Sequence, residues 1–297
     1  MVMYANCHLH STFSDGAFTP EKLIEMGKEL GHQAMVLTDH DTIRGTYFMH
    51  RAARRAGVKS ILGCEFSTRG PEGCEIHLLG FDFNRDHRDM AALLEVSASR
   101  SATIARYLLE KGIERGTVRE GVVWNDVIKE YPYHDYISNG HIFDIYRRRG
   151  IYKPEEYGEY FVSTFKKTPE RMAEIEASSD KLVLPKTETV VKTILAAGGV
   201  PVAAHLGEAP FGKIEYAEEL REMGVRGFEV CHPGNNEYAR KYLVDFCNEY
   251  GLYKTGGTDH SAELGGCKNI FEAHNLPDDC GGMSEEDFMT LYERRLG

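Results

Sequence analysis

The chain has 297 residues, 42% of them hydrophobic, and a formal net charge of −11. This length and composition can bury a sizeable core, either as one large domain or as a domain with an insertion, whereas the acidic balance excludes a global basic face that would hold a long nucleic acid. The seven cysteines are odd in number and lack CxxC spacing, which argues against a disulfide scaffold or a zinc knuckle.

Residues 1–85 alternate short apolar strands with amphipathic helices, a pattern that predicts a parallel α/β architecture. Thr19 and Pro20 are typical of a helix start, an N-cap followed by proline at N1, and apolar residues with helical spacing follow until Gly31. We expect a second helix to end at Gly57. The expected elements are helices over 20–30 and 46–56 and strands over 1–5, 33–38, 60–66 and 75–81.

The pattern changes between residues 88 and 185, where one long helical segment over 91–111 is followed by charged, tyrosine-containing segments without strand candidates. We therefore predict one α/β domain, residues 1–87 and 186–297, interrupted by a helical insertion over 88–185. In the second part of the domain the expected elements are helices over 190–197, 215–223 and 238–250 and strands over 200–204, 227–230 and 253–258.

His8 and His10 follow the first predicted strand and are two residues apart, so both side chains point the same way. With Asp15 in the following Ser/Gly turn, they are well placed to hold a divalent metal, although a chance pair at a strand end is the alternative. The other strand candidates also carry histidine, aspartate or glutamate residues, which can bind metals, mostly at their C-terminal ends, where the active sites of α/β enzymes lie. These residues are His40, Glu65, His77, His205, His232, Asp259 and His260.

These donors are too many for one tetrahedral ion and suit a cluster of two or three. Imidazole and carboxylate without thiolate favour zinc, manganese or iron over copper. Glu65 could bridge two ions about 4 Å apart, the separation typical of two-metal hydrolases. Such a pair would supply hydroxide at neutral pH and neutralise the charge of a phosphate.

The motifs around these residues resemble the PHP (polymerase and histidinol phosphatase) family of metal-dependent phosphoesterases. The resemblance covers most of the chain outside the insertion and implies a distorted (β/α)7 barrel with its metal cluster at the strand C-termini. Six motifs carry it, in the order found in the family: His8-Leu9-His10 with Ser14-Asp15-Gly16, Leu37-Thr38-Asp39-His40-Asp41, Gly63-Cys64-Glu65-Phe66-Ser67, His77-Leu78-Leu79-Gly80, Ala203-Ala204-His205 and Gly257-Thr258-Asp259-His260.

The resemblance also implies roles for these residues. Asp15, His40 and His260 are the candidate catalytic residues, with His40 or Asp15 as a proton donor if a third metal site is empty. The implied ligand sets are His8, His10, Glu65 and Asp259 for the first ion, Glu65, His77 and His205 for the second, and Asp15, His40 and His260 for the third.

In the insertion, Ser138-Asn139-Gly140-His141-Ile142-Phe143 resembles a subgroup that includes small nucleotide phosphatases and short-RNA exonucleases. There a helical cap carries a histidine that reaches the substrate, a role that His141 fits; a capping or surface histidine is the alternative. Arg148 is a second substrate-binding candidate, with a solvated helix end as its alternative. His232 is a third candidate, for substrate binding or proton transfer.

One motif departs from the family pattern. The last motif usually has one residue between aspartate and histidine, whereas Asp259 and His260 are adjacent here. Neighbouring residues of a regular strand point to opposite faces, so either the chain bends at this place or the third site is altered.

From the residues and the resemblance together, we expect a phosphoester hydrolase with two or three divalent ions (Mn, Zn or Fe) acting on a small phosphorylated metabolite, a nucleotide or sugar phosphate, through metal-bound hydroxide. The alternatives are a cyclic phosphodiesterase that then removes the phosphate, a metal-dependent amidohydrolase, and a non-catalytic binding module. No signal peptide or membrane-spanning stretch is evident, so we expect a cytoplasmic protein without a membrane partner. The sequence does not indicate an oligomeric state.

Overall fold

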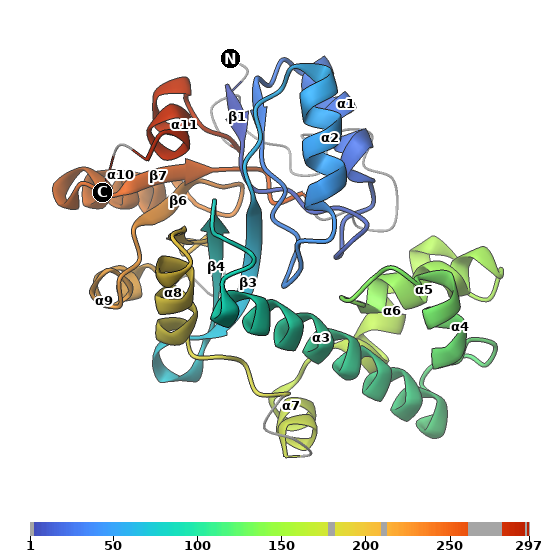
Figure 1. Cartoon of the computed structure of the whole chain (residues 1–297). Coiled ribbons are helices and arrows are strands. Elements are labelled where there is room, and N and C mark those ends of the chain that lie inside the picture. The colour runs from blue at the N-terminus through green and yellow to red at the C-terminus, as the bar shows by residue number, and fades with distance from the viewer. Residues whose placement is uncertain (1–2, 178–181, 209–212, 261–280, 295, 297) are drawn as a thin grey trace.

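The computed structural model describes residues 3–177, 182–208, 213–260, 281–294 and 296. It confirms the mixed α/β class, with helices around two sheets (Figure 1). Among the described residues, no helix combines the length and the apolar composition needed to cross a membrane.

The N-terminal part holds a small parallel sheet covered by two helices. Strand β1 (Ala5–Asn6) pairs with β2 (Ala34–Met35), and helices α1 (Pro20–Glu29) and α2 (Thr46–Ala56) pack against each other. The predicted helix signals act as expected: the Thr19 hydroxyl accepts a hydrogen bond from the Lys22 amide, and Gly57 ends α2 with a φ of +73°. Both strands are shorter than the predicted ones.

A five-stranded sheet forms the rest of the domain, in the order β3 (Gly63–Arg69), β4 (Glu75–Phe81), β5 (Val200–Ala203), β6 (Gly227–Cys231) and β7 (Tyr253–Gly256). Strands β5 to β7 are parallel, but β4 is antiparallel to both β3 and β5, so the prediction of parallel strands over the first 85 residues is wrong for β4. Residues 70–74, including the 3₁₀ turn η1 (Pro71–Gly73), are too short for a parallel crossover and make a hairpin instead. As a result His77, early in β4, pairs with Ser67, late in β3.

Further backbone contacts join the two sheets on both sides. The Cys7 amide donates to the Gly256 carbonyl (3.1 Å) and the Asp259 amide to the His8 carbonyl (2.9 Å), which links β7 to the segment after β1. On the other side, His40 and Glu65 form a parallel bridge. The named strands of the described residues nevertheless do not form one closed sheet, and the (β/α)7 barrel stays a prediction.

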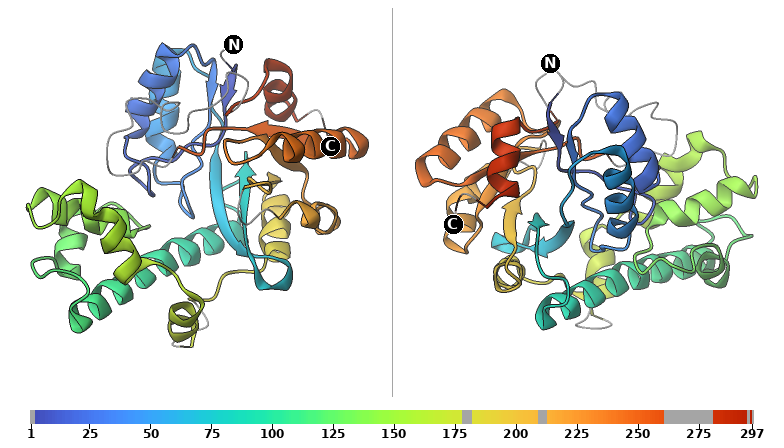
Figure 2. Two further views of the ribbon diagram at one scale, coloured as in Figure 1. Left: turned by 180° about the vertical axis from the view of Figure 1, so that it is seen from behind. Right: turned by 45° about the horizontal axis from the view of Figure 1, so that its top comes forward.

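Four further helices pack on this sheet (Figures 1 and 2). They are α8 (Thr187–Ala196) against β3 to β5, α9 (Ala217–Glu222), preceded by η5 (Ile214–Tyr216), α10 (Glu237–Tyr250) against β6 and β7, and α11 (Glu285–Tyr292) against β7. The sequence reasoning did not predict α11.

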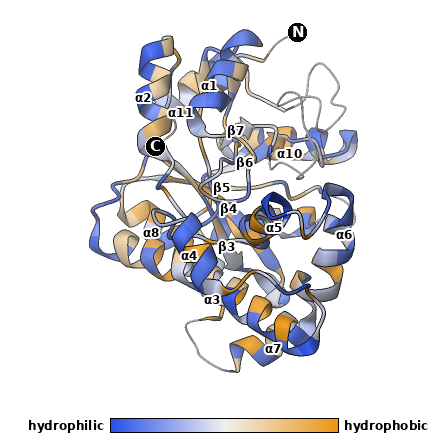
Figure 3. Cartoon of the chain, turned by 90° about the vertical axis from the view of Figure 1, so that its right-hand side faces the viewer, coloured by the Kyte–Doolittle hydropathy of each residue, from blue (hydrophilic) through white to orange (hydrophobic). Residues whose placement is uncertain are grey.

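The described residues between β4 and α8 form helices, turns and loops and have an apolar cluster of their own. Leu109, Ile142, Phe143 and Tyr146 belong to this cluster, whose described members all lie between residues 104 and 182. Helix α3 runs from beside β4 out to the other helices, which carry both apolar and polar faces (Figures 1 and 3). The elements are α3 (Arg88–Arg115), α4 (Trp124–Glu130), α5 (Asn139–Arg148), η2 (Pro154–Glu156), α6 (Tyr157–Tyr160), the π-helical η3 (Phe161–Phe165) and α7 (Pro169–Glu176).

Candidate metal centre

His8 and His10 lie in the segment after β1, and both are fully buried. Leu9, between them, holds the segment in extended form, because its amide donates to the Thr38 hydroxyl (3.1 Å) and its backbone bridges to His260. Side chains two residues apart then face the same side. The two rings lie 5.2 Å apart between centroids, as the sequence spacing predicts.

The Glu65 carboxylate lies at the centre of the site, on β3, and is fully buried. Both of its oxygens are surrounded by imidazole nitrogens from separate parts of the chain. Its Oε2 lies 3.2 Å from His8 Nε2, 3.2 Å from His10 Nε2 and 3.1 Å from His40 Nδ1, and its Oε1 lies 3.0 Å from His77 Nδ1 and 3.1 Å from His205 Nε2.

Asp259 completes the set around the first two histidines. Its Oδ1 lies 2.9 Å from His10 Nε2 and 3.4 Å from His8 Nε2. Close approach of this segment requires a glycine before it, since a Cβ at Gly257 would lie 2.3 Å from the Cβ of His8. One atom each from His8, His10, Glu65 and Asp259 lies within 4.8 Å of the others, so the structure brings the predicted first ligand set together.

The donor atoms of this set fit a divalent ion. In the described part of the chain, His8 Nε2, His10 Nε2 and Glu65 Oε2 are buried and make no hydrogen bond, although they face one another. Most buried polar atoms in proteins have a hydrogen-bond partner, so three unpaired ones that face one another need an explanation. Two imidazole nitrogens and two carboxylate oxygens around one point suit zinc, manganese or iron.

Three further groups of candidate ligands share residues with the first, each again within 4.8 Å. They are His40, Glu65 and His77; His10, Asp15 and His40; and His8, Glu229 and His232. Because the two Glu65 oxygens face different histidines, this carboxylate is placed to bridge two ions. His205 is not in these groups but contacts Glu65 directly.

His260, which the sequence analysis placed with Asp15 and His40, is not in any of the groups of candidate ligands within 4.8 Å that the described residues form. Asp259 has a φ of +46°, in the left-handed region, so the chain bends between the two residues, as one of the two predicted explanations requires. The buried His260 ring stacks on Phe18, with centroids 5.6 Å apart and planes at 10°. The structure therefore groups Asp15 and His40 with His10 instead of His260.

Glu229, on β6, is a residue that the sequence reasoning missed. It is fully buried; its Oε1 lies 2.9 Å from His8 Nδ1 and its Oε2 accepts from the His205 amide (3.0 Å). A carboxylate can only accept here, so His8 donates through Nδ1, and its Nε2 faces the cluster. The available signal was an acidic residue between Phe228 and Val230 in a buried strand, which is unusual unless the acid is paired.

Asp39 holds the segment that carries His10 and Asp15. Its buried carboxylate accepts from the Ser11 amide (2.6 Å), the Ser11 hydroxyl (2.8 Å) and the Ser14 hydroxyl (2.7 Å). Burial raises the pKa of Asp39 more than these hydrogen bonds lower it. The aspartate beside His40 thus shapes the site instead of binding in it.

The charges of the cluster favour ionised carboxylates. Burial raises the pKa of the Glu65 carboxyl, but the surrounding histidines, foremost His40 and His8, bring it well below its ordinary value. Burial lowers the pKa of His8, but the Glu229, Asp259 and Glu65 carboxylates raise it well above the ordinary value. A concentration of carboxylates that attracts protons onto histidines attracts metal cations in the same way, and metal binding releases those protons.

Two histidines of the insertion contact the segment after His10. His141, on α5, accepts the Ser138 amide with Nδ1 (3.0 Å), so its Nε2 carries a hydrogen and donates to the Thr12 carbonyl (3.1 Å). His134 Nε2 lies 2.9 Å from the same carbonyl oxygen, and its ring stacks on Phe13. Burial lowers the pKa of His141 to about 4.

The other two substrate-binding candidates lie in different surroundings. His232 is buried, accepts the Gly234 amide with Nδ1 (2.9 Å) and lies 3.2 Å from Asp259 Oδ2 through Nε2, at the edge of the cluster. Arg148 lies at the end of α5, with its side chain 46% exposed. It pairs with Glu130 (3.0 Å) and Asp144 (2.8 Å), and no contact in the described part of the chain joins it to the cluster.

Comparisons with known proteins agree with this geometry. The family model for the PHP domain matches residues 6–197. A 5'-3' exoribonuclease of Haemophilus influenzae is 28% identical over 85% of this chain and 88% of its own length. A phosphoribosyl 1,2-cyclic phosphate 1,2-diphosphodiesterase of Eggerthella lenta is 24% identical, covering 89% and 96%. A 3',5'-nucleoside bisphosphate phosphatase of Chromobacterium violaceum is 24% identical, covering 92% of each chain.

A solved structure has the same fold. The crystal structure of a Bifidobacterium adolescentis protein that is named a metal-dependent phosphoesterase by assignment only superposes with a TM-score of 0.76, covering 99% of this chain and 97% of the other. Its sequence is 24% identical to this one, so the likeness is one of fold.

Proposed function

Because this chain belongs to the PHP domain family, we propose that it is a metal-dependent phosphoester hydrolase whose substrate is a small phosphorylated metabolite, foremost a nucleotide. The relatives named as phosphodiesterase and phosphatase support a phosphoric ester hydrolase. The observation that carries the proposal is the Glu65 carboxylate, which two groups of candidate ligands share.

In this proposal, His8, His10, Glu65 and Asp259 hold one ion, and Glu65 with His77, His205 and His40 holds a second. Divalent ions at these positions would lower the pKa of a water molecule and neutralise the charge of a phosphate. The protein's own residues set the geometry: Glu229 orients His8 through Nδ1, and Asp39 orients the loop with Asp15.

Asp15 and His40 form a partly open side of the cluster, with side chains 33% and 16% exposed. His40 Nε2 lies 3.7 Å from Asp15 Oδ2. Such a pair can hold a proton and deliver it to a leaving oxygen. The same two residues, with His10, could instead hold a third ion, and we propose these two roles as alternatives for one place.

The insertion would select the substrate. Its histidines His134 and His141 contact the loop that carries Asp15, so the insertion borders this partly open side of the cluster. The relatives named above act on nucleotidic or phosphoribosyl phosphates, and we carry this substrate class over to the present chain.

The test is phosphate release from a panel of nucleoside bisphosphates, short oligonucleotides, sugar phosphates and cyclic phosphates, before chelation, after chelation and after manganese is added back. We expect release that disappears with the chelator and returns with the metal. The Arg106→Gln variant, altered on the exposed face of α3, should retain the activity. No release from any compound, while metal analysis finds two or more ions bound, would contradict the proposal and favour an amidohydrolase or a binding module.

A further inference from the structure

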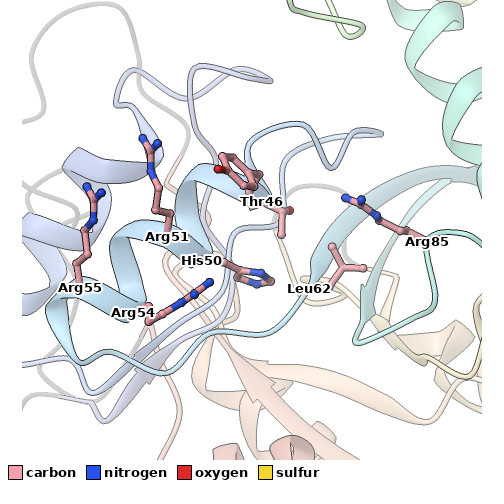
Figure 4. Close-up of a pocket in the computed structure, with 8 residues that line it drawn as sticks. Thr46, His50, Arg51, Arg54, Arg55, Leu62 and Arg85 are labelled. Atoms are coloured by element: carbon pink, nitrogen blue, oxygen red, sulfur yellow. The ribbon is translucent and has the colours of Figure 1, made fainter.

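A cavity of about 590 Å³ lies beside α2, and none of the candidate metal ligands lines it (Figure 4). Residues of α2 form one wall of the cavity. Leu62, just before β3, and Arg85, in the segment after β4, form the rest of its lining. Four of the eight lining side chains are arginines: Arg51, Arg54, Arg55 and Arg85.

The positive charge of this cavity contrasts with the net charge of −11 of the chain. The eight lining residues include no carboxylate. Outside the cavity, Glu21 pairs with Arg51 (3.2 Å) and Asp86 lies 3.9 Å from Arg85, but all four side chains are more than 40% exposed. Water-exposed ion pairs of this kind are weak, so they leave the arginines available to an anion.

Arg54 and Arg55 make no ion pair with a carboxylate in the part of the chain that the structure describes. Both lie in the last turn of α2, where positively charged side chains interact favourably with the helix dipole. The helix end does not explain the cluster, however, because Arg85 comes from another segment and Arg51 lies a turn earlier.

Two polar side chains of the same cavity lack a partner. Thr46 is 7% exposed, and its hydroxyl makes no hydrogen bond in the described structure. His50, one turn further along α2, has a buried Nε2 that is also without a hydrogen bond. Both residues line the cavity, but the two unpaired atoms themselves are buried, so each side chain would have to turn toward a ligand to donate to its acceptor oxygens.

An aromatic ring lies at the edge of this cluster. Tyr47 is 65% exposed and lines the cavity, with the Arg51 guanidinium 5.8 Å from the centre of its ring. An exposed aromatic ring next to arginine is the arrangement on which nucleobases stack.

We propose that this cavity is a second ligand site, separate from the metal centre, that binds a nucleoside polyphosphate. The arginines hold the phosphates, and the base stacks on Tyr47; Thr46 and His50 could donate to phosphate oxygens once their side chains turn toward the cavity. Guanidinium groups match phosphate oxygens in paired hydrogen bonds, and the cavity volume is within the range of small-molecule sites. A phosphate chain without a base would use the arginines but leave the exposed ring without a contact.

The test is calorimetric titration of the metal-free protein with ATP in excess EDTA, which keeps the metal centre from binding phosphate through ions. We expect millimolar or tighter binding. The double variant Arg54→Gln/Arg55→Gln should weaken it at least tenfold, since it removes two charge-assisted contacts. The matched double variant Arg106→Gln/Arg115→Gln, which removes two exposed charges from α3, should bind like the unaltered protein.

Tripolyphosphate and the Tyr47→Ala variant test the base. Tyr47→Ala should weaken the binding of ATP severalfold and leave the binding of tripolyphosphate unchanged. Equal affinity for ATP and tripolyphosphate in the unaltered protein would overturn the assignment to a nucleotide. The proposal also fails if ATP does not bind at millimolar concentration, or if its binding survives the Arg54/Arg55 double variant and is lost in Glu65→Ala.

Discussion

Protonation of His141 should destabilise the protein as the pH falls, because the buried ring is held in its neutral form. Its folded pKa is about 4, against an ordinary value of 6.5 for the unfolded chain. The unfolded chain therefore takes up the proton first, so this contribution to stability is fully present above pH 6.5 and is lost between pH 6.5 and about 4. At 1.36 kcal/mol for each pKa unit, the loss amounts to about 3 kcal/mol, most of it by pH 4.5.

The His141→Gln variant isolates this effect. Glutamine does not titrate, yet its amide can still donate to the Thr12 carbonyl, so the variant should lose no more than about 1 kcal/mol at pH 7.5. We would measure the free energy of unfolding by urea titration of both metal-free proteins at pH 7.5, 6.5, 5.5 and 4.5. Between pH 7.5 and pH 4.5, the free energy of unfolding of the variant should rise by about 2–3 kcal/mol relative to that of the unaltered protein. Parallel pH profiles of the two proteins would refute the reasoning.

Three other changes test separate parts of the structure. Arg100→Ala leaves the buried Asp41 carboxylate without its 3.3 Å partner and should lower the free energy of unfolding by about 3–5 kcal/mol in urea titrations; a loss below 1 kcal/mol would show that water replaces the arginine. Glu229→Gln weakens the hold on His8 Nδ1 and should reduce metal affinity about tenfold in competition with a chelator, and unchanged affinity would count against an orienting role. Glu65→Ala should abolish most phosphate release with the circular dichroism spectrum intact, whereas full activity would contradict the shared carboxylate.

Local signals predicted the helices well. Proline at N1 after Thr19 and glycine after residue 56 mark helix ends through backbone geometry alone, and the structure places α1 and α2 within one or two residues of the expected ranges. The spacing of His8 and His10 likewise predicted a common direction for their side chains. Signals of this kind depend on a few neighbouring residues and are therefore visible in the sequence.

Contacts between distant segments left no such signal. Glu229 is recognisable as part of the site only once β6 lies beside His8, 221 positions away in sequence. The acceptor for His134 and His141 is a main-chain oxygen, at Thr12, which every residue type carries. The bend at Asp259 depends on a backbone conformation that the adjacency to His260 suggested but could not specify.

The hairpin of β3 and β4 makes the cluster sensitive to the length of one turn. Glu65 pairs with Leu79 and Ser67 with His77, so the glutamate and the histidine share a face in this register. One residue added between 70 and 74, if it shifted the pairing by one position, would turn His77 to the opposite face and remove it from Glu65. The loop between α3 and α4, at residues 116–123, has no contact with the cluster in the described structure, so its length can vary while the site keeps its geometry.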